Sequence, residues 1–122
     1  MPIKDPEIEQ PIPVEWRSVI AGIVEDLRHR RAVQREGPDS QIICDHSTLE
    51  NLYENIEAYG DRLTNLAEEA WRTSCMRWME DHWHLLVDLC TVNEGVSDLV
   101  LFVELREEKG AKQWTVISVH VP

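Results

Sequence analysis

The sequence predicts an α+β protein in which N-terminal helices pack on one face of a four-stranded antiparallel sheet. In the last third of the chain, apolar and polar residues alternate with the period of two that is typical of strands. In the earlier part, apolar residues recur at helical spacing. Because helices come first and strands follow one another, we expect the helices to lie together on one side of the sheet.

The length and composition indicate one domain, residues 1–122, with 43% hydrophobic and 29% charged residues. No apolar run approaches the ~20 residues of a membrane-spanning helix, and no basic segment followed by an apolar one opens the chain. Cys44, Cys75 and Cys90 cannot all pair, and none forms a Cys-x-x-Cys motif. We therefore expect free thiols and a cytoplasmic location.

The net charge of −11 comes from 12 basic and 23 acidic residues. So many carboxylates repel phosphate groups, which argues against nucleic acid and acidic membrane surfaces as partners. The charge would suit a basic protein partner, because opposite charges speed encounter and help orientation. Solubility alone explains the charge equally well.

Residues 1–13 contain four prolines and predict an extended lead-in. The next segment predicts a helix by a stripe of apolar residues: Trp16, Val19, Ile20, Ile23, Val24 and Leu27. A basic cluster between Arg28 and Arg35 follows it. Cations stabilise a helix C-terminus, so we expect a structural role for this cluster, with a contact patch for an acidic partner as the alternative.

The middle of the chain predicts further helices, which makes residues 14–71 the helical region. Residues 41–44 are apolar but short, an edge strand or a loop plug. Ser47 and Glu50 form a capping box that opens a second helix, and Gly60 is its expected stop. A short third helix is expected to begin after a cap at Asp61, to run through Leu63 and Leu66, and to end near Trp71.

The sheet is expected over residues 73–121, with strands at 73–79, 83–91, 98–106 and 113–121. Their short connections favour hairpins and hence a meander. The general plan is similar to cystatin-like and nuclear-transport-factor-like cones.

Sorting the strands by parity gives two different faces. The core face includes Leu99, Leu101, Val103 and Leu105 on one strand and Thr115, Ile117, Val119 and Val121 on the next. The other face mixes aromatic and ionisable groups, which is typical of a ligand pocket or a protein interface. Its candidate binding residues are Arg77, His84, Asp88, Phe102, Glu104, Arg106, Trp114 and His120. Coverage by another segment of the chain is the alternative.

No motif supports a particular chemistry. In Asp81-His82-Trp83-His84 both imidazoles point the same way, a spacing used by zinc sites, but His82 falls at an expected turn and no paired cysteines support it. Two groups of residues are weakly supported as catalytic sites. Nucleophilic catalysis would use Cys90 with His84 and Asp88, and acid–base catalysis would use Asp88 with His120. We therefore expect no metal, no cofactor and no catalytic residue.

Short sequences along most of the chain resemble a family of small uncharacterised bacterial proteins: Pro11-Ile12-Pro13-x-x-Trp16-Arg17, Trp71-x-Thr73-Ser74, Trp78-Met79, His82-Trp83, Leu86-Val87-Asp88-Leu89, Ser97-Asp98-Leu99-Val100-Leu101 and Val119-x-Val121-Pro122. The resemblance implies a bacterial single-domain protein and no mechanism. The leading hypothesis is a non-enzymatic binding protein, most concretely an immunity protein that neutralises a basic toxin domain. The alternatives are a small-molecule binder or enzyme with a pocket on the mixed face, and a homodimer that pairs this face with itself.

Overall fold

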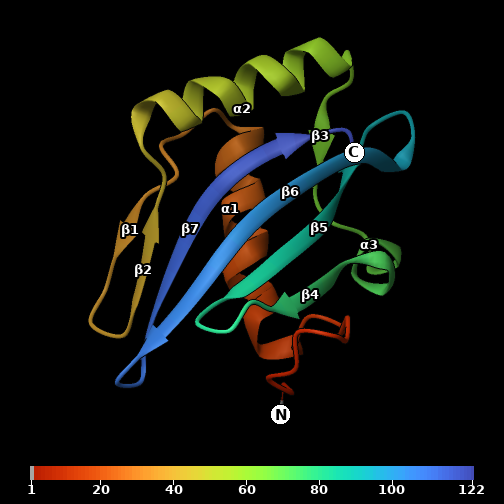
Figure 1. The fold of residues 1–122 in the computed structure, drawn as a ribbon. Coiled ribbons are helices and arrows are strands. Elements are labelled where there is room, and N and C mark those ends of the chain that lie inside the picture. The colour runs from red at the N-terminus through yellow and green to blue at the C-terminus, as the bar shows by residue number, and fades with distance from the viewer. Residues whose placement is uncertain (1) are drawn as a thin grey trace.

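The computed structural model describes residues 2–122. Three α-helices and seven strands follow a short 3-10 turn, η1 (Val14–Trp16) (Figure 1). The helices are α1 (Arg17–Arg28), α2 (His46–Tyr59) and α3 (Glu68–Thr73). The strands are β1 (Arg35–Glu36), β2 (Ser40–Ile43), β3 (Leu63–Thr64), β4 (Cys75–Trp78), β5 (Trp83–Thr91), β6 (Gly95–Glu108) and β7 (Ala111–His120).

The strands form one curled, mixed sheet that wraps around α1 as a half-barrel (Figure 1). The order is β1-β2-β7-β6-β5-β3, and β4 also pairs with β5. β2 is parallel to β7, whereas the other pairs are antiparallel. The α+β class is thus confirmed, but the four-stranded meander is wrong. β2 falls on the apolar segment 41–44, which is a strand but not at the edge of the sheet, because β1 flanks it. β1 and β3 interrupt the region 14–71 that was expected to be helical, and that expectation is wrong there. All three strands are only two to four residues long, too short to show a period of two.

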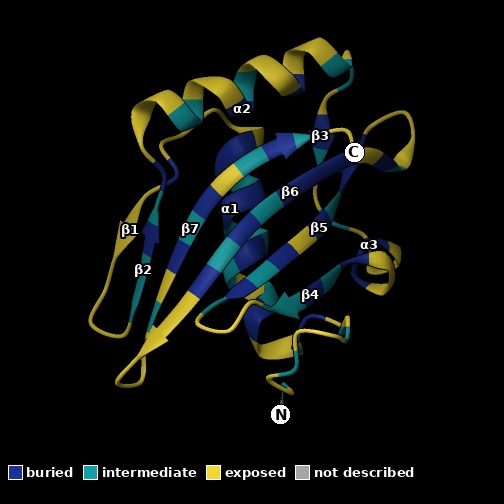
Figure 2. Cartoon of the chain, viewed as in Figure 1, coloured by how far each residue is buried: buried dark blue, intermediate teal, exposed yellow. Residues whose placement is uncertain are grey.

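The core lies between α1 and the sheet, as the buried residues in Figure 2 show. Trp16, Ile20, Ile23, Val24 and Leu27 are buried and Val19 is partly buried against the core, so the predicted helical stripe is confirmed. The core faces of β5 and β6 also follow the predicted parity, with every second residue buried in both. Burial of these large side chains is the main force that holds helix and sheet together.

On β7 the predicted parity is wrong over most of the strand. The pairing with β6 shifts between Phe102 and Val103, where β7 carries one extra residue. As a result Trp114 and Val116 face the core, whereas Ile117 is 37% exposed. Of the four residues predicted for the core here (Thr115, Ile117, Val119 and Val121), only Val119 is buried.

α2 lies along the end of the sheet that is uppermost in Figure 1. Its Asn55 side chain donates a hydrogen bond of 2.7 Å to the carbonyl of Val119 on β7. The helix starts one residue before the expected N-cap, because Asp45, not Ser47, caps it by accepting from the Thr48 backbone N–H at 2.8 Å. Gly60 ends it with a φ of 85°, as predicted.

Replacing Asp45 with alanine is expected to lower the stability near neutral pH and to matter less in acid. The Thr48 N–H holds the pKa of the Asp45 carboxyl below its ordinary 3.8. A folded-state pKa that is lowered gives stability above the unfolded value, which is lost as the pH falls through the folded value. Thermal melts at neutral and acidic pH would test this, with Asp45→Asn as the control that keeps an N-cap acceptor.

The N-terminal lead-in is extended and is attached to the sheet. Gln10 and Met76 exchange two backbone hydrogen bonds of 2.9 and 2.8 Å, and Ile12 is 2% exposed. The segment therefore borders β4, which it joins through one antiparallel bridge between Gln10 and Met76.

The basic cluster after α1 pairs with carboxylates of the same chain. Asp26, buried on α1, lies 3.3 Å from both Arg31 Nε and Arg35 Nη2. Arg28 pairs with Glu25 on α1, and Arg30 pairs with Glu57 on α2. These contacts tie α1 to the segments that follow it, which supports the structural role expected for the cluster.

Candidate functional site

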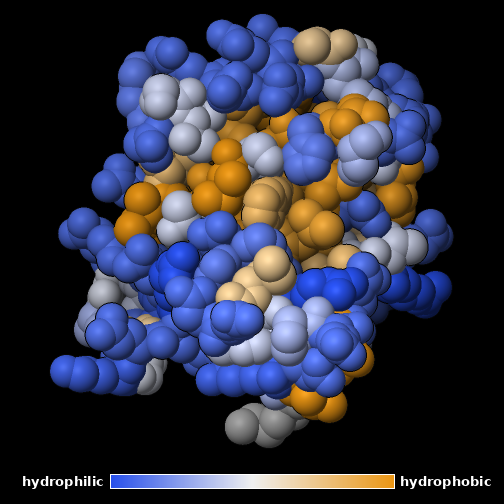
Figure 3. Space-filling view, viewed as in Figure 1, coloured by the Kyte–Doolittle hydropathy of each residue, from blue (hydrophilic) through white to orange (hydrophobic). Residues whose placement is uncertain are grey.

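The face of the sheet turned away from α1 is the main candidate site. Figure 3 shows apolar side chains gathered there, below α2 and surrounded by polar residues. Phe102 is half-buried on this face, and Leu86 and Ile117 are 40% and 37% exposed. We call this surface the open face. Apolar side chains exposed in the middle of a sheet are a feature of binding surfaces.

A groove of about 350 Å³ runs along the open face beside β4. Its lining combines apolar and ionisable residues: Glu9, Cys75, Met76, Arg77, Met79, His84, Leu86, Phe102 and His120. Glu9 belongs to the N-terminal lead-in and Met79 to the β4–β5 turn. The other lining residues lie on β4, β5, β6 and β7. The groove is large enough for a small molecule or for side chains of a protein partner.

Four of the sequence-predicted site residues line this groove: Arg77, His84, Phe102 and His120. The rings of His84 and Phe102 lie edge to face with centroids 4.9 Å apart. Arg77 does not pair with Asp88, because its guanidinium contacts Glu9 at 3.2 Å and the Pro6 carbonyl at 3.0 Å. The groove therefore carries few uncompensated charges.

The remaining predicted residues have separate positions. The Asp88 carboxylate accepts a hydrogen bond from the Thr73 hydroxyl, and its backbone N–H donates to Ser74 Oγ, which fixes Asp88 against the end of α3. Trp114 was placed on the open face by parity, and this is wrong. It is 1% exposed in the core, where its ring lies 6.0 Å from that of Trp16, because of the extra residue on β7.

A cluster of metal-capable groups occupies the end of the open face at the β4–β5 turn. One ligand atom each from His82, His84 and Glu104 lie within 4.8 Å of one another. Glu104 Oε1 is 3.5 Å from His84 Nε2 and 3.7 Å from His82 Nε2. Sequence reasoning considered the two histidines but did not join them to Glu104, although antiparallel pairing of β5 with β6 places His84 opposite it.

Neighbouring charges shape the electrostatics of this cluster. Hydrogen bonds from His82 and then Arg106 lower the pKa of the Asp81 carboxyl. Burial lowers the pKa of the His84 imidazole, and the nearby His82 adds to this effect. A lowered imidazole pKa favours the neutral ring, whose free nitrogen can accept a hydrogen bond or bind a metal.

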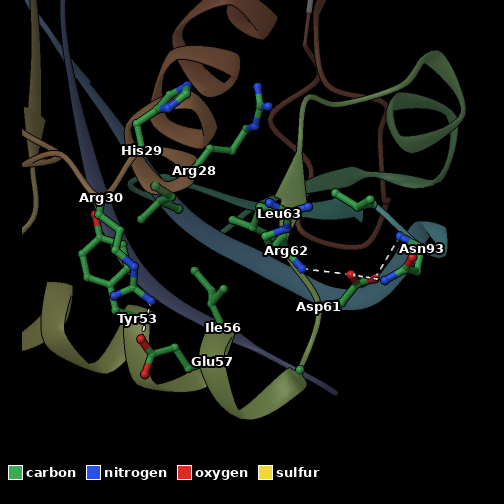
Figure 4. A pocket seen from close by; sticks show the side chains of 13 residues that line it. Arg28, His29, Arg30, Tyr53, Ile56, Glu57, Asp61, Arg62, Leu63 and Asn93 are labelled. Atoms are coloured by element: carbon green, nitrogen blue, oxygen red, sulfur yellow. Dashed lines mark hydrogen bonds and ion pairs between the residues drawn. The ribbon is translucent and has the colours of Figure 1, made fainter.

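A larger cavity of about 810 Å³ lies between the end of α1, α2 and β3 (Figure 4). Arg28, Arg30 and Arg62 line it together with Glu57 and Asp61. Figure 4 shows the Arg30–Glu57 pair and the contacts of Asp61 with Asn93 and the Arg62 backbone. Because most of these charges meet a partner within the chain, the cavity is a weaker candidate than the open face.

Cys44 is expected to react slowly with alkylating agents in the folded protein. Burial, and to a lesser degree the charge of Asp45, raises the pKa of its thiol from 9.0 to about 11. Only the thiolate reacts, so the folded protein should be alkylated roughly 100-fold more slowly than the unfolded chain at about pH 8. Mass spectrometry of iodoacetamide-treated protein, with and without urea, measures this. Equal rates in both would contradict it.

The fold and the open face define an acidic α+β protein with an uncovered half-barrel sheet. The chain belongs to the family described as Domain of unknown function (DUF7668), whose model matches residues 24–122. This agrees with the resemblance to an uncharacterised family. No curated protein and no solved structure gives a significant match. Within residues 2–122, no helix is long and apolar enough to cross a membrane.

Proposed function

We propose that this protein is a non-enzymatic binding protein that docks a basic protein partner on its open face. The observation that carries the proposal is the apolar centre of that face, where Leu86 and Ile117 are 40% and 37% exposed. The other face of the same strands is fully packed against α1. Burial of such a patch in a complex would supply the main favourable free energy of binding.

The surrounding charge favours a basic partner. Asp88 lies on the open face with the Thr73 hydroxyl as its side-chain partner, while Glu9 and Glu104 are neutralised in part by Arg77 and Arg106. Exposed Glu50 and Glu54 on α2 add to the negative charge of the chain, −11 in total. Complementary charge would speed association and orient the partner, and it argues against nucleic acid and acidic membranes.

The most concrete form of this proposal is an immunity protein that neutralises a bacterial toxin domain in the cytoplasm. Toxin domains that degrade nucleic acid carry basic active sites, which an acidic inhibitor can cover. The acidity of the chain and the apolar open face support this form. A homodimer through the open face is the competing use of the same surface.

To test the proposal, a partner is captured from the native host lysate with the wild-type protein. Its affinity is then measured for the wild type and for variants of the open face. We expect a basic protein, bound in stoichiometric amount, whose affinity falls at least about tenfold for Leu86→Lys. Val14→Lys is the matched control, because Val14 is also apolar and exposed (69%) but lies in η1, outside the sheet. Equal binding by both variants, or self-association through Leu86 without a partner, would contradict the proposal.

The alternative function is a small-molecule binder or enzyme that uses the groove. The observation that favours it is the groove itself, whose volume of about 350 Å³ lies in the range of ligand pockets. A cone-shaped sheet of cystatin-like or nuclear-transport-factor-like plan would suit such a pocket. Ligand screening by thermal shift discriminates the two, because only the groove hypothesis expects Phe102→Ala to abolish stabilisation by a small molecule.

A further inference from the structure

We propose that His82, His84 and Glu104 form a binding site for a divalent transition-metal ion, with Zn²⁺ as the ion that their chemistry fits best. Two imidazoles and one carboxylate are ligands that zinc accepts readily. Their ligand atoms come within 4.8 Å of one another, and all three side chains are partly shielded from solvent. The site lies at one end of the open face, but binding of an ion there does not depend on the docking of a protein partner.

The distances are close to those of a tetrahedral zinc site. Zinc–ligand bonds of ~2.0–2.1 Å place neighbouring ligand atoms about 3.3 Å apart. Glu104 Oε1 lies 3.5 Å from His84 Nε2 and 3.7 Å from His82 Nε2. All three ligand atoms lie within 4.8 Å of one another, so they must draw closer together by up to about 1.5 Å to bind one ion.

The backbone holds the three ligands on one side of the sheet. Trp83 is 1% exposed in the core, so its neighbours His82 and His84 both project to the opposite side. The turn that carries His82 is closed by a hydrogen bond of 2.8 Å from the Met79 N–H to the His82 carbonyl. Glu104 stands directly opposite His84 in the β5–β6 register. Residues opposite one another on antiparallel strands have Cβ atoms about 5 Å apart, within reach of a shared ion.

The environment of His82 is that of a metal-ligating histidine. Its Nδ1 bonds to the Asp81 carboxylate, whose other oxygen accepts from Arg106 Nη1 at 3.2 Å. Its Nε2 is buried and has no hydrogen-bond partner within the part of the chain that the structure describes. A carboxylate on one ring nitrogen, with the other nitrogen facing the ion, is the arrangement that orients histidine ligands. A bound ion would satisfy the nitrogen that is otherwise left unpaired at a cost in free energy.

Three protein ligands leave a fourth coordination position for water or another molecule. His84 also lines the groove, so the ion would lie at the edge of the groove. An ion bound there would act as a Lewis acid on the open face. Its fourth coordination position could bind an oxygen, nitrogen or sulfur atom of a ligand.

Isothermal titration calorimetry tests the site, with zinc chloride added to protein from which metal has been removed by a chelator. We expect one ion per chain, and at least tenfold weaker binding for His82→Ala, His84→Ala and Glu104→Gln. Asp81→Asn should weaken binding about tenfold by releasing His82 Nδ1. His46→Ala is the control, because His46 lies on α2 with Glu50 as its partner, away from the open face, and its loss should leave binding unchanged.

Cobalt chloride provides a second readout that separates this site from the three cysteines. We expect bound Co²⁺ to give the absorption spectrum of a tetrahedral site, without a thiolate charge-transfer band. The Glu104→Gln variant should not give this tetrahedral spectrum. Circular dichroism of each variant in the presence of chelator shows whether it is folded, and Glu104→Gln keeps the shape of the side chain if an alanine variant fails to fold. Absence of binding to the wild type, a thiolate band, or binding that survives in folded Glu104→Gln and His84→Ala would overturn the proposal.

Discussion

Replacing Trp83 with alanine is expected to destabilise the protein by about 3–5 kcal/mol, a large part of the ~5–15 kcal/mol that holds a domain folded. Trp83 is 1% exposed, and its ring lies 6.1 Å from that of Trp16 and 4.9 Å from that of Trp78. It joins η1, β4 and β5 at the lower end of the core. Removal of the indole leaves a cavity that these elements cannot fill without separating.

Trp78→Ala is the matched control for Trp83→Ala. Trp78 belongs to the same aromatic cluster, but it is only half-buried, on the edge strand β4. Its replacement should cost clearly less, since solvent already reaches the side chain. Urea unfolding followed by far-ultraviolet circular dichroism measures both without relying on tryptophan fluorescence. Equal losses, or less than ~1 kcal/mol for Trp83→Ala, would contradict the assignment of Trp83 to the centre of the core.

The long elements were predictable from the sequence because their periodicity repeats many times. The stripe from Trp16 to Leu27 and the alternation from Leu99 to Leu105 each place their residues in the core, as observed. A repeat of this length outweighs single exceptions. It is therefore the centre of the half-barrel, α1 with β5 and β6, that the sequence describes best.

The edges of the sheet were not predictable in the same way. β1 and β3 are only two residues long. β2 pairs in parallel with β7, which lies at the other end of the chain, and local sequence patterns do not predict such a long-range pairing. The displacement of Trp114 into the core has a similar origin. One extra residue on β7 reverses the faces along that strand, and nothing in its composition marks where the extra residue falls.

The candidate site was predicted in part from the sequence. The parity of β5 and β6 placed His84, Phe102 and Glu104 on one face, and the structure has them there. His82 was set aside because it falls in a turn, yet that turn is short and closed, so its side chain continues the alternation of β5. The register of the β5–β6 hairpin would have been enough to bring Glu104 to the histidines.

Removal of Arg31 and Arg35 together is expected to cost about 2–3 kcal/mol, because it leaves the Asp26 carboxylate buried without a counter-charge. The Asp26 side chain is 7% exposed, whereas those of Arg31 and Arg35 are 57% and 58% exposed. Water around the arginines moderates the loss, so the cost stays below that of a fully buried pair. Arg28→Ala removes a cation whose partner Glu25 is solvent-exposed, and it should change stability least.

The decisive comparison is the triple variant Asp26→Ala, Arg31→Ala, Arg35→Ala. If the loss in the double variant comes from a stranded charge, then removal of Asp26 as well should restore part of the stability. Asp26 lies in the last turn of α1, where the helix dipole disfavours a negative charge and alanine has the better helix propensity. Urea unfolding of all three proteins gives the order: wild type, then triple, then double variant. A triple variant less stable than the double would mean that Asp26 contributes to packing independently of the two arginines.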